Sequence, residues 1–283
     1  MLLVVDSGST KADWLLADKG KVVSTFNTVG FNPYFHDSDF VFDTLSNSES
    51  LAPYSSSISE LYFFGAGCSS TKLKAIVHAG LQRYFKKAKV IVDHDLLACA
   101  YATCGNQPGI ACIIGTGSNS CYFDGKQVHQ KNYGLGYILG DEGSGSYYGK
   151  KLVTHFLYGL MPPHLHADFK EQYQLDKNSI VSKVYSEPNA NVWLASLSVF
   201  LSRHKDDTYV KDLIRTGMNE FMKLYVVHYE NYSHIPVHFV GSLAFYFENE
   251  LKEAANDFDI TIGKIIKQPV EELMNYFLKK NNS

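Results

Sequence analysis

The sequence contains no long apolar run and no block of like charge. No apolar stretch approaches the ~20 residues that a membrane-spanning helix needs. The 26 basic and 29 acidic residues are spread along the chain and leave a net charge of −3, so neither a nucleic acid nor a membrane is expected as a partner. The G-x-x-x-x-G-K-[ST] phosphate-binding pattern is also missing, because the nearest string, GSGSYYGKK, has the wrong spacing. The sequence is therefore expected to form ordinary globular domains.

Cysteine is scarce, and its spacing fits no common framework. The chain has an odd number of cysteines and no C-x-x-C pair, and these cysteines lie among apolar neighbours: Cys68, Cys99, Cys104, Cys112 and Cys121. This pattern predicts buried, reduced thiols in a cytoplasmic protein, with an iron–sulfur or zinc site as the alternative. His164 and His166 have no ligand partners at metal spacing, and Pro162 and Pro163 predict an exposed loop around them.

Strands and helices alternate along the first part of the chain, which predicts an α/β fold. Apolar patterns indicate a strand over 2–5, hairpin strands over 12–18 and 21–28, a strand over 61–67, a helix over 69–86, a strand over 89–95 and a helix over 96–103. The loop CGNQPG near residue 105 marks the best domain boundary. We therefore expect one domain over 1–108 and a second over 109–268, with a final helix over 269–283 that can pack on the first.

The second domain begins as the first one does. Residues 110–132 repeat the order of residues 2–27, with an apolar strand, a glycine–hydroxyl turn, a second strand, a Gly-Lys turn and a third strand. Further patterns predict helices over 144–160, 192–202, 207–229 and 243–255, and strands over 236–241 and 260–266. The sequence thus indicates the duplication of one supersecondary unit.

The first strand ends in the polar segment DSGSTK, residues 6–11. Glycine permits positive φ and a close approach of the backbone to a ligand, and consecutive N–H groups in such a turn can bind phosphate. Ser9 and Thr10 add hydroxyl donors, and Lys11 adds a positive charge. Asp6 would repel a phosphate but can hold hydrated Mg²⁺. A hairpin with a Gly-Ser tip and no ligand is the alternative.

A similar loop, GTGSNS, opens the second unit. Aligned on the turn, Ser7-Gly8-Ser9 falls opposite Thr116-Gly117-Ser118, and Gly115 replaces Asp6. Two such loops could hold one polyphosphate from both sides of a domain cleft, which makes Gly115, Thr116 and Gly117 candidate phosphate ligands.

Together these loops and the segment GLGYILGDEGSG, residues 134–145, resemble the superfamily of acetate kinases, sugar kinases and actin-like ATPases. Within it, the chain is most similar to the N-acetylglucosamine kinases and the BadF/BadG/BcrA/BcrD-type ATPases. The resemblance covers essentially the whole chain. It implies two ribonuclease-H-like domains with a central cleft that close over ATP and Mg²⁺, and it places Gly241 and Ser242, in FVGSLAF, along the adenosine.

The same resemblance assigns the acceptor side. Phosphoryl transfer to a hydroxyl needs a carboxylate to accept the proton. The family's catalytic aspartate lies at a strand-to-helix junction, which corresponds to Asp95, and the alternative role of Asp95 is a plain helix N-cap. Asn32, before Pro33, and Asp141 match positions that contact acceptor hydroxyls. Their alternative roles are a turn residue and a charge at a helix N-terminus.

The resemblance implies a kinase that phosphorylates a small-molecule amino sugar, first of all N-acetylglucosamine at its 6-hydroxyl. Glucosamine and N-acetylmuramic acid are alternative substrates, and a homodimer is compatible with the sequence. A second hypothesis is an ATPase that activates a radical dehydratase or reductase. Those relatives bind an iron–sulfur cluster through cysteines in a glycine-containing context that this sequence lacks.

Overall fold

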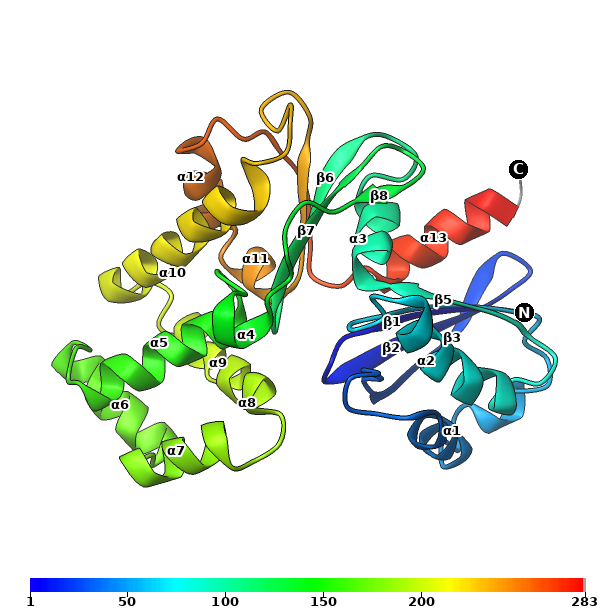
Figure 1. Ribbon diagram of the computed structural model, residues 1–283, viewed down its shortest axis with the longest axis horizontal. Coiled ribbons are helices and arrows are strands. Elements are labelled where there is room, and N and C mark those ends of the chain that lie inside the picture. Colours follow the sequence, from blue (N-terminus) through cyan, green and yellow to red (C-terminus); the bar gives the residue numbers. More distant parts are fainter. Residues whose placement is uncertain (282–283) are drawn as a thin grey trace. The chain divides into compact units, whose positions relative to one another are not determined.

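The computed structural model describes residues 1–281 and divides the chain into two compact units, each with its own hydrophobic core (Figure 1). Among the described residues, the first unit contains 1–107 together with 268–281. The second unit is the continuous segment from Pro108 to Lys267. Each unit contains a five-stranded mixed sheet with helices, which confirms the α/β class.

The sheet of the first unit has the strand order β3-β2-β1-β4-β5. Its three antiparallel strands form a meander, and β1, β4 and β5 run parallel. Parallel neighbours require crossover connections, which helices supply here. The strands are β1 (Leu2–Ser7), β2 (Lys11–Asp18), β3 (Lys21–Val29), β4 (Glu60–Gly65) and β5 (Lys89–His94).

Helices cover both faces of this sheet, and the alternation of side chains along the strands explains which face each helix covers. Leu3 and Phe63 belong to one core with residues of α1 and α2, whereas Tyr62, on the opposite face, stacks on Phe277 of α13 at 4.0 Å between ring centroids. Helix α13 also packs against α3. The helices are α1 (Ser38–Ser46), the 3₁₀ turn η1 (Ala52–Tyr54), α2 (Thr71–Tyr84), α3 (Asp95–Thr103) and α13 (Val270–Asn281).

The sheet of the second unit repeats this topology. Its order, β10-β9-β6-β7-β8, has the same antiparallel meander at one side and the same parallel strands at the other. The duplication that the sequence indicates is therefore present in the fold. The strands are β6 (Gly109–Ile114), β7 (Ser118–Phe123), β8 (Val128–His129), β9 (Val237–Val240) and β10 (Ile262–Ile266).

Most helices of the second unit lie between β8 and β9 in sequence. Two long predicted helices are broken: 192–202 divides at Leu197, and 243–255 divides at Phe247. The helices are α4 (Gly136–Leu139), α5 (Gly145–Leu157), α6 (Pro163–Tyr173), α7 (Lys177–Tyr185), α8 (Ala190–Ser196), α9 (Ser198–Arg203), α10 (Thr208–Phe221), the π-helical turn η2 (Met222–Val226), α11 (Ser242–Tyr246) and α12 (Glu248–Asn256).

The exposed loop predicted around His164 is wrong, because Pro163 begins helix α6. Proline is tolerated in the first turn of a helix, where its missing N–H would have no intrahelical partner. The ring nitrogen Nε2 of His164 lies 2.7 Å from an oxygen of Asp207, and the ring of His166 stacks on Phe156. Within residues 1–281, no group of three or more His, Cys, Asp or Glu side chains is arranged to hold a metal ion.

All five cysteines are buried and free of disulfide bonds, as the sequence predicts.

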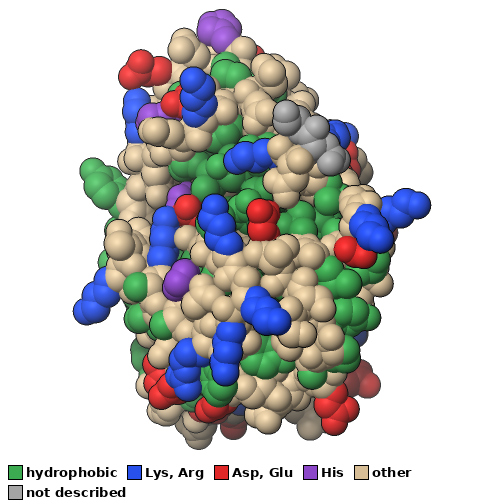
Figure 2. Space-filling model, turned by 90° about the vertical axis from the view of Figure 1, so that its right-hand side faces the viewer, with side chains coloured by type: hydrophobic (Ala, Val, Ile, Leu, Met, Phe, Trp, Pro, Cys, Tyr) green, Lys and Arg blue, Asp and Glu red, His purple; other side chains and the backbone are tan. Residues whose placement is uncertain are grey.

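In the part of the chain that the structure describes, none of the helices has the length and apolarity required to cross a membrane. On the face shown in Figure 2, Lys and Arg side chains are interspersed with Asp and Glu.

Candidate active site

The first candidate loop connects β1 to β2. In the pairing register Ser7 lies opposite Ala12, the connection between the two strands is Gly8–Thr10, and Gly8 N–H donates to the carbonyl of Lys11 at 2.9 Å. Gly8 does not have positive φ. The close approach occurs instead at Gly30, because a Cβ there would lie 1.9 Å from the carbonyl oxygen of Gly8.

The polar side chains of this loop have different surroundings. Thr10 is exposed and Ser9 is half-buried. The amine of Lys11 is paired with a carboxylate oxygen of Asp13 at 2.6 Å. Both hydroxyls are thus available at the surface of the first unit, whereas the charge of Lys11 is partly neutralised by a neighbour.

Asp6 lies at the end of β1 and pairs in register with Asp13 of β2. Burial, together with the nearby carboxylates of Asp95 and Asp13, raises the pKa of Asp6 to about 7. A buried carboxyl group that faces like charges is stabilised by a cation. The donor chemistry around Asp6 therefore fits a hydrated Mg²⁺, whose preferred ligands are oxygens.

The junction between β5 and α3 carries three polar residues with separate roles. Asp93 forms an ion pair with Lys74 at 2.5 Å. His94 is the N-cap of α3, since its Nδ1 accepts the N–H of Leu97 at 3.2 Å, and burial lowers the pKa of His94. Asp95 is the first helical residue, and its carboxylate accepts the N–H of Leu96 at 2.9 Å. The alternative N-cap role for Asp95 is thus wrong, because the neutral imidazole of His94 fulfils it.

Asn32 is buried next to the first loop. Its Nδ2 donates to the hydroxyl of Ser9 at 3.1 Å, and its Oδ1 accepts the N–H of Tyr34 at 3.0 Å. Gly67, with φ of +80°, is required beside it, because a Cβ there would lie 2.4 Å from Oδ1 of Asn32. The structure thus links a predicted acceptor residue, Asn32, to a predicted nucleotide residue, Ser9.

The second candidate loop connects β6 to β7. Ile114 pairs with Ser118, so this loop is Gly115–Gly117, and its first residue corresponds to Gly8 rather than to Asp6 as the sequence alignment has it. The start of α5 anchors the loop: Gly145 N–H donates to the carbonyl of Gly115 at 2.8 Å, and Ser146 N–H donates to that of Thr116 at 3.0 Å.

Asp141 contacts this second loop directly. A Cβ on Gly117 would lie 2.8 Å from a carboxylate oxygen of Asp141, and the N–H of Ser118 donates to the other oxygen at 3.3 Å. Asp141 itself has φ of +59°, in the left-handed region that few non-glycine residues adopt. Burial raises the pKa of Asp141 to about 6, partly offset by the Ser118 N–H and by Lys150.

Gly241 also lies against the second loop. Its φ is +129°, and a Cβ there would lie 2.2 Å from the carbonyl oxygen of Ile114. Gly241 follows β9 and precedes α11, which begins at Ser242. The structure thus brings Gly241, Asp141 and the Gly115–Gly117 loop together within the second unit.

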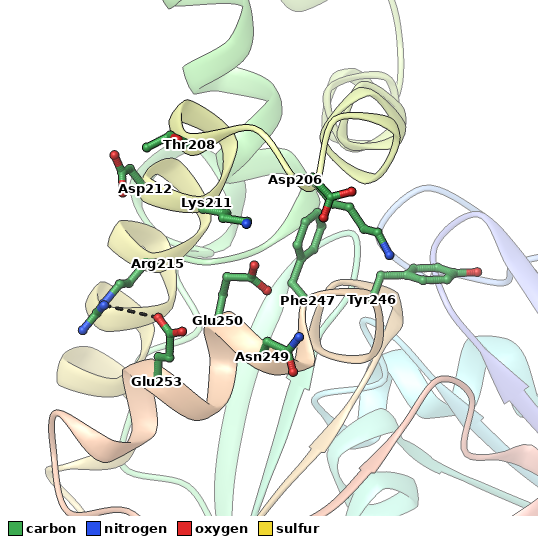
Figure 3. A pocket seen from close by; sticks show the side chains of 11 residues that line it. Asp206, Thr208, Lys211, Asp212, Arg215, Tyr246, Phe247, Asn249, Glu250 and Glu253 are labelled. Carbon is green, nitrogen blue, oxygen red and sulfur yellow. Dashed lines mark hydrogen bonds and ion pairs between the residues drawn. The ribbon is translucent and has the colours of Figure 1, made fainter.

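A cavity of about 390 Å³ lies next to α11 in the second unit. The close-up shows Tyr246 and Phe247 at one end, and Arg215 forms an ion pair with Glu253 at the other (Figure 3). Its remaining lining residues are polar or charged: Lys205, Asp206, Thr208, Lys211, Asp212, Asn249 and Glu250. The sequence analysis does not single out these residues, because they come from α10, α11, α12 and the segments beside them, and no local motif joins them.

Comparison with solved structures identifies the family. A protein from Porphyromonas gingivalis, provisionally named an N-acetylglucosamine kinase, is 37% identical to this chain, and the alignment covers 99% of this chain and 100% of that one with a TM-score of 0.94. The chain belongs to the N-acetylglucosamine kinase family. The predicted family and enzyme class, a sugar kinase of the actin-like ATPase superfamily, are confirmed.

Two further solved structures share the fold of this sugar kinase. One, from Chromobacterium violaceum, is also provisionally named an N-acetylglucosamine kinase, with 18% identity, 98% coverage of both chains and a TM-score of 0.73. The other is a ROK family glucokinase from Streptomyces griseus in complex with glucose and AMPPNP, with 14% identity, coverage of 99% and 98%, and a TM-score of 0.54. No family model and no curated protein matches the chain.

Proposed function

We propose that this sugar kinase transfers the γ-phosphoryl group of ATP to an amino sugar, with N-acetylglucosamine and its 6-hydroxyl as the acceptor. The observation that carries the proposal is the 37% identity over the full length of the P. gingivalis protein. The use of ATP is supported by the AMPPNP bound to the glucokinase of the same fold. The five buried thiols favour a cytoplasmic location.

In the first unit, we assign Asp95 as the general base and Asn32 as a ligand of the acceptor hydroxyls. Asp95 accepts the proton of the sugar hydroxyl while the hydroxyl oxygen attacks the γ-phosphorus and the bond to the β-phosphate oxygen breaks. Ser9, Thr10 and Lys11 bind phosphate oxygens. Asp6 would hold Mg²⁺ through water, and the ion would neutralise charge on the phosphates.

In the second unit, Gly115, Thr116 and Gly117 bind phosphate oxygens, and Asp141 accepts hydrogen bonds from sugar hydroxyls. Gly241 and Ser242 lie along the adenosine. The cavity beside α11 would take the adenine base, since Tyr246 and Phe247 give it aromatic surface and its other side chains offer hydrogen bonds.

The test is an ATP-depletion assay over a panel of free sugars that includes N-acetylglucosamine, glucosamine, N-acetylmannosamine, N-acetylmuramic acid and glucose. We expect N-acetylglucosamine to give the highest kcat/KM and to yield the 6-phosphate, identified by the ³¹P–¹H coupling in NMR spectra. A higher kcat/KM for another sugar would refute the substrate. Fast ATP hydrolysis without any sugar, together with iron absorbance in the purified protein, would favour the activator ATPase.

The phosphate loops are tested by Thr10→Val and Thr116→Val. Each change removes one hydrogen bond from a hydroxyl to a charged phosphate oxygen. Such a hydrogen bond contributes about 1.5–3 kcal/mol to the binding free energy. We expect the Kd of AMPPNP, measured by calorimetry, to rise about 10- to 150-fold in each variant. Thr25→Val, on exposed β3, is the matched control. An unchanged Kd in either loop variant would remove that loop from the nucleotide site.

A further inference from the structure

Tyr225 occupies an unusual position in the second unit. It lies in the π-helical turn Met222–Val226, where the N–H of Val227 donates to the carbonyl of Met222 at 3.1 Å. Such turns are rare and occur frequently at functional sites. The ring of Tyr225 is 5% exposed and stacks on Phe221, with centroids 4.9 Å apart and ring planes 7° apart. The sequence analysis predicts only a helix over 207–229 for this segment.

The hydroxyl of Tyr225 makes two hydrogen bonds to the segment that carries the candidate acceptor residue. It accepts the backbone N–H of Asp141 at 3.1 Å and donates to Oε2 of Glu142 at 3.0 Å. The backbone carbonyl of Tyr225 accepts the hydroxyl of Ser120, on β7, at 2.6 Å. One residue therefore connects β7, which leaves the second loop, to the turn at Asp141.

The hydrogen bond from the N–H of Asp141 to the hydroxyl of Tyr225 holds Asp141 in an unfavourable backbone conformation. Asp141 has φ of +59°, which a residue with a side chain adopts only when its surroundings require it. In this conformation the carboxylate of Asp141 lies against Gly117 and accepts the hydrogen bond from the N–H of Ser118. Burial and the carboxylate of Glu142 raise the pKa of Tyr225, so its hydroxyl stays protonated and continues to donate.

We propose that Tyr225 is a positioning residue for the acceptor sugar: its hydroxyl holds the backbone of Asp141 so that the carboxylate lies against the Gly115–Gly117 loop and accepts sugar hydroxyls. This proposal rests on the proposed function, in which Asp141 binds the acceptor. Tyr225 acts through Asp141 and touches neither substrate.

Tyr225→Phe tests the proposal, because it removes the hydroxyl and keeps the stacked ring. The KM for N-acetylglucosamine should rise about tenfold, as expected for the loss of a buried hydrogen bond, while the KM for ATP stays within about twofold. Tyr229→Phe is the matched control. It removes a buried hydroxyl from the same segment, but that hydroxyl donates to the carbonyl of Ser120 at 3.1 Å and not to the turn at Asp141.

A double-mutant cycle separates positioning from simple loss of stability. If Tyr225 acts through Asp141, Asp141→Asn should raise the sugar KM much less in the Tyr225→Phe background than in the wild type, because the carboxylate is already displaced. Additive effects would overturn the proposal. Hydrogen exchange of the Asp141 amide, which needs no substrate, should accelerate in Tyr225→Phe and not in Tyr229→Phe, and equal exchange would also overturn it.

The outcomes distinguish this proposal from the proposed function. If Asp141→Asn alone raises the sugar KM but Tyr225→Phe does not, the positioning role fails and the acceptor role of Asp141 stands. If Asp141→Asn leaves the KM of every sugar unchanged, the acceptor role fails, and with it the proposal for Tyr225.

Discussion

Two aspartates lie two residues apart at the end of β5, and their surroundings assign them different roles. Asp93 forms an ion pair with Lys74 at 2.5 Å. Asp95 is the first residue of α3, and its negative charge raises the pKa of Asp6. Only a carboxylate that can take up a proton near the substrate serves as a general base. The proposal therefore names Asp95, and not Asp93, for this role.

We predict that Asp95→Asn lowers kcat by about 10²–10⁴-fold, the usual contribution of general base catalysis, because the amide keeps the shape but cannot accept the proton. The Kd of AMPPNP should change by less than about twofold. Steady-state kinetics and calorimetry measure both values. Asp93→Asn, which only weakens an ion pair, is the control and should retain kcat within about threefold. Full activity in Asp95→Asn would show that another group takes the proton.

The raised pKa of Asp141 predicts a pH dependence for sugar binding. The carboxylate accepts hydrogen bonds from hydroxyls when it is ionised, and with a pKa of about 6 its ionised fraction falls as the pH decreases below 6. The sugar KM at saturating Mg-ATP should thus rise up to about tenfold per pH unit below pH 6 and stay constant above pH 7. Asp141→Asn should abolish this dependence. A KM that rises only below pH 4 would contradict the assigned environment.

At the scale of the element, a glycine constrains the second unit where β9 meets α11. Gly241→Ala would place a Cβ 2.2 Å from a backbone oxygen at φ of +129°, so we predict a loss of about 2–4 kcal/mol in the free energy of unfolding. Gly115→Ala, in the adjacent loop, meets no atom within 4 Å and should lose less than about 1 kcal/mol. Urea denaturation compares the two. Equal losses would show that the loop relaxes around the added methyl group.

The sequence predicts elements well where periodicity and turn residues agree. The hairpin of β2 and β3, the helix α2 and the duplicated strand order all follow from patterns within ~30 residues. The prediction fails at α6, where two prolines suggest a loop although the second one begins a helix. It also fails at Phe247, which divides α11 from α12 without a glycine or proline to signal the break.

The candidate site is predictable only in part. The motifs identify Asp95, Asp141 and the two loops, whose assigned roles remain proposals. The contacts that shape the site join residues far apart in sequence: Ser118 meets Asp141, and Tyr225 meets Asp141 from 84 residues away. No local pattern encodes such pairs, since they depend on how strands and helices pack. The cavity beside α11 is missed for the same reason.

At the scale of the molecule, the first unit depends on a helix from the far end of the chain. We predict that Phe277→Ala destabilises this unit by about 3–5 kcal/mol, because the buried ring stacks on Tyr62 and lies near Phe64. Hydrogen exchange should accelerate in β1 and β4 and remain unchanged in β6 and β9.

Tyr276→Phe provides the control for this experiment. It removes only the hydrogen bond that the hydroxyl donates to Asn106 at 3.2 Å, and it keeps the ring that stacks on Tyr101. Its exchange pattern should match that of the wild type. Equal acceleration in both units of Phe277→Ala would show that the two units unfold as one cooperative body.

The return of α13 to the first unit also fixes an order of events on the ribosome. After residue 107 is synthesised, the 108–267 segment must still be made before α13 can follow, which takes on the order of 10–30 s at ~5–20 residues per second. During this interval Tyr62 and Phe64 lack their partner ring, while the second unit has its entire sequence available as soon as it leaves the tunnel. The second unit can therefore complete its folding first, and the nascent first unit is the part of the chain that chaperones would protect.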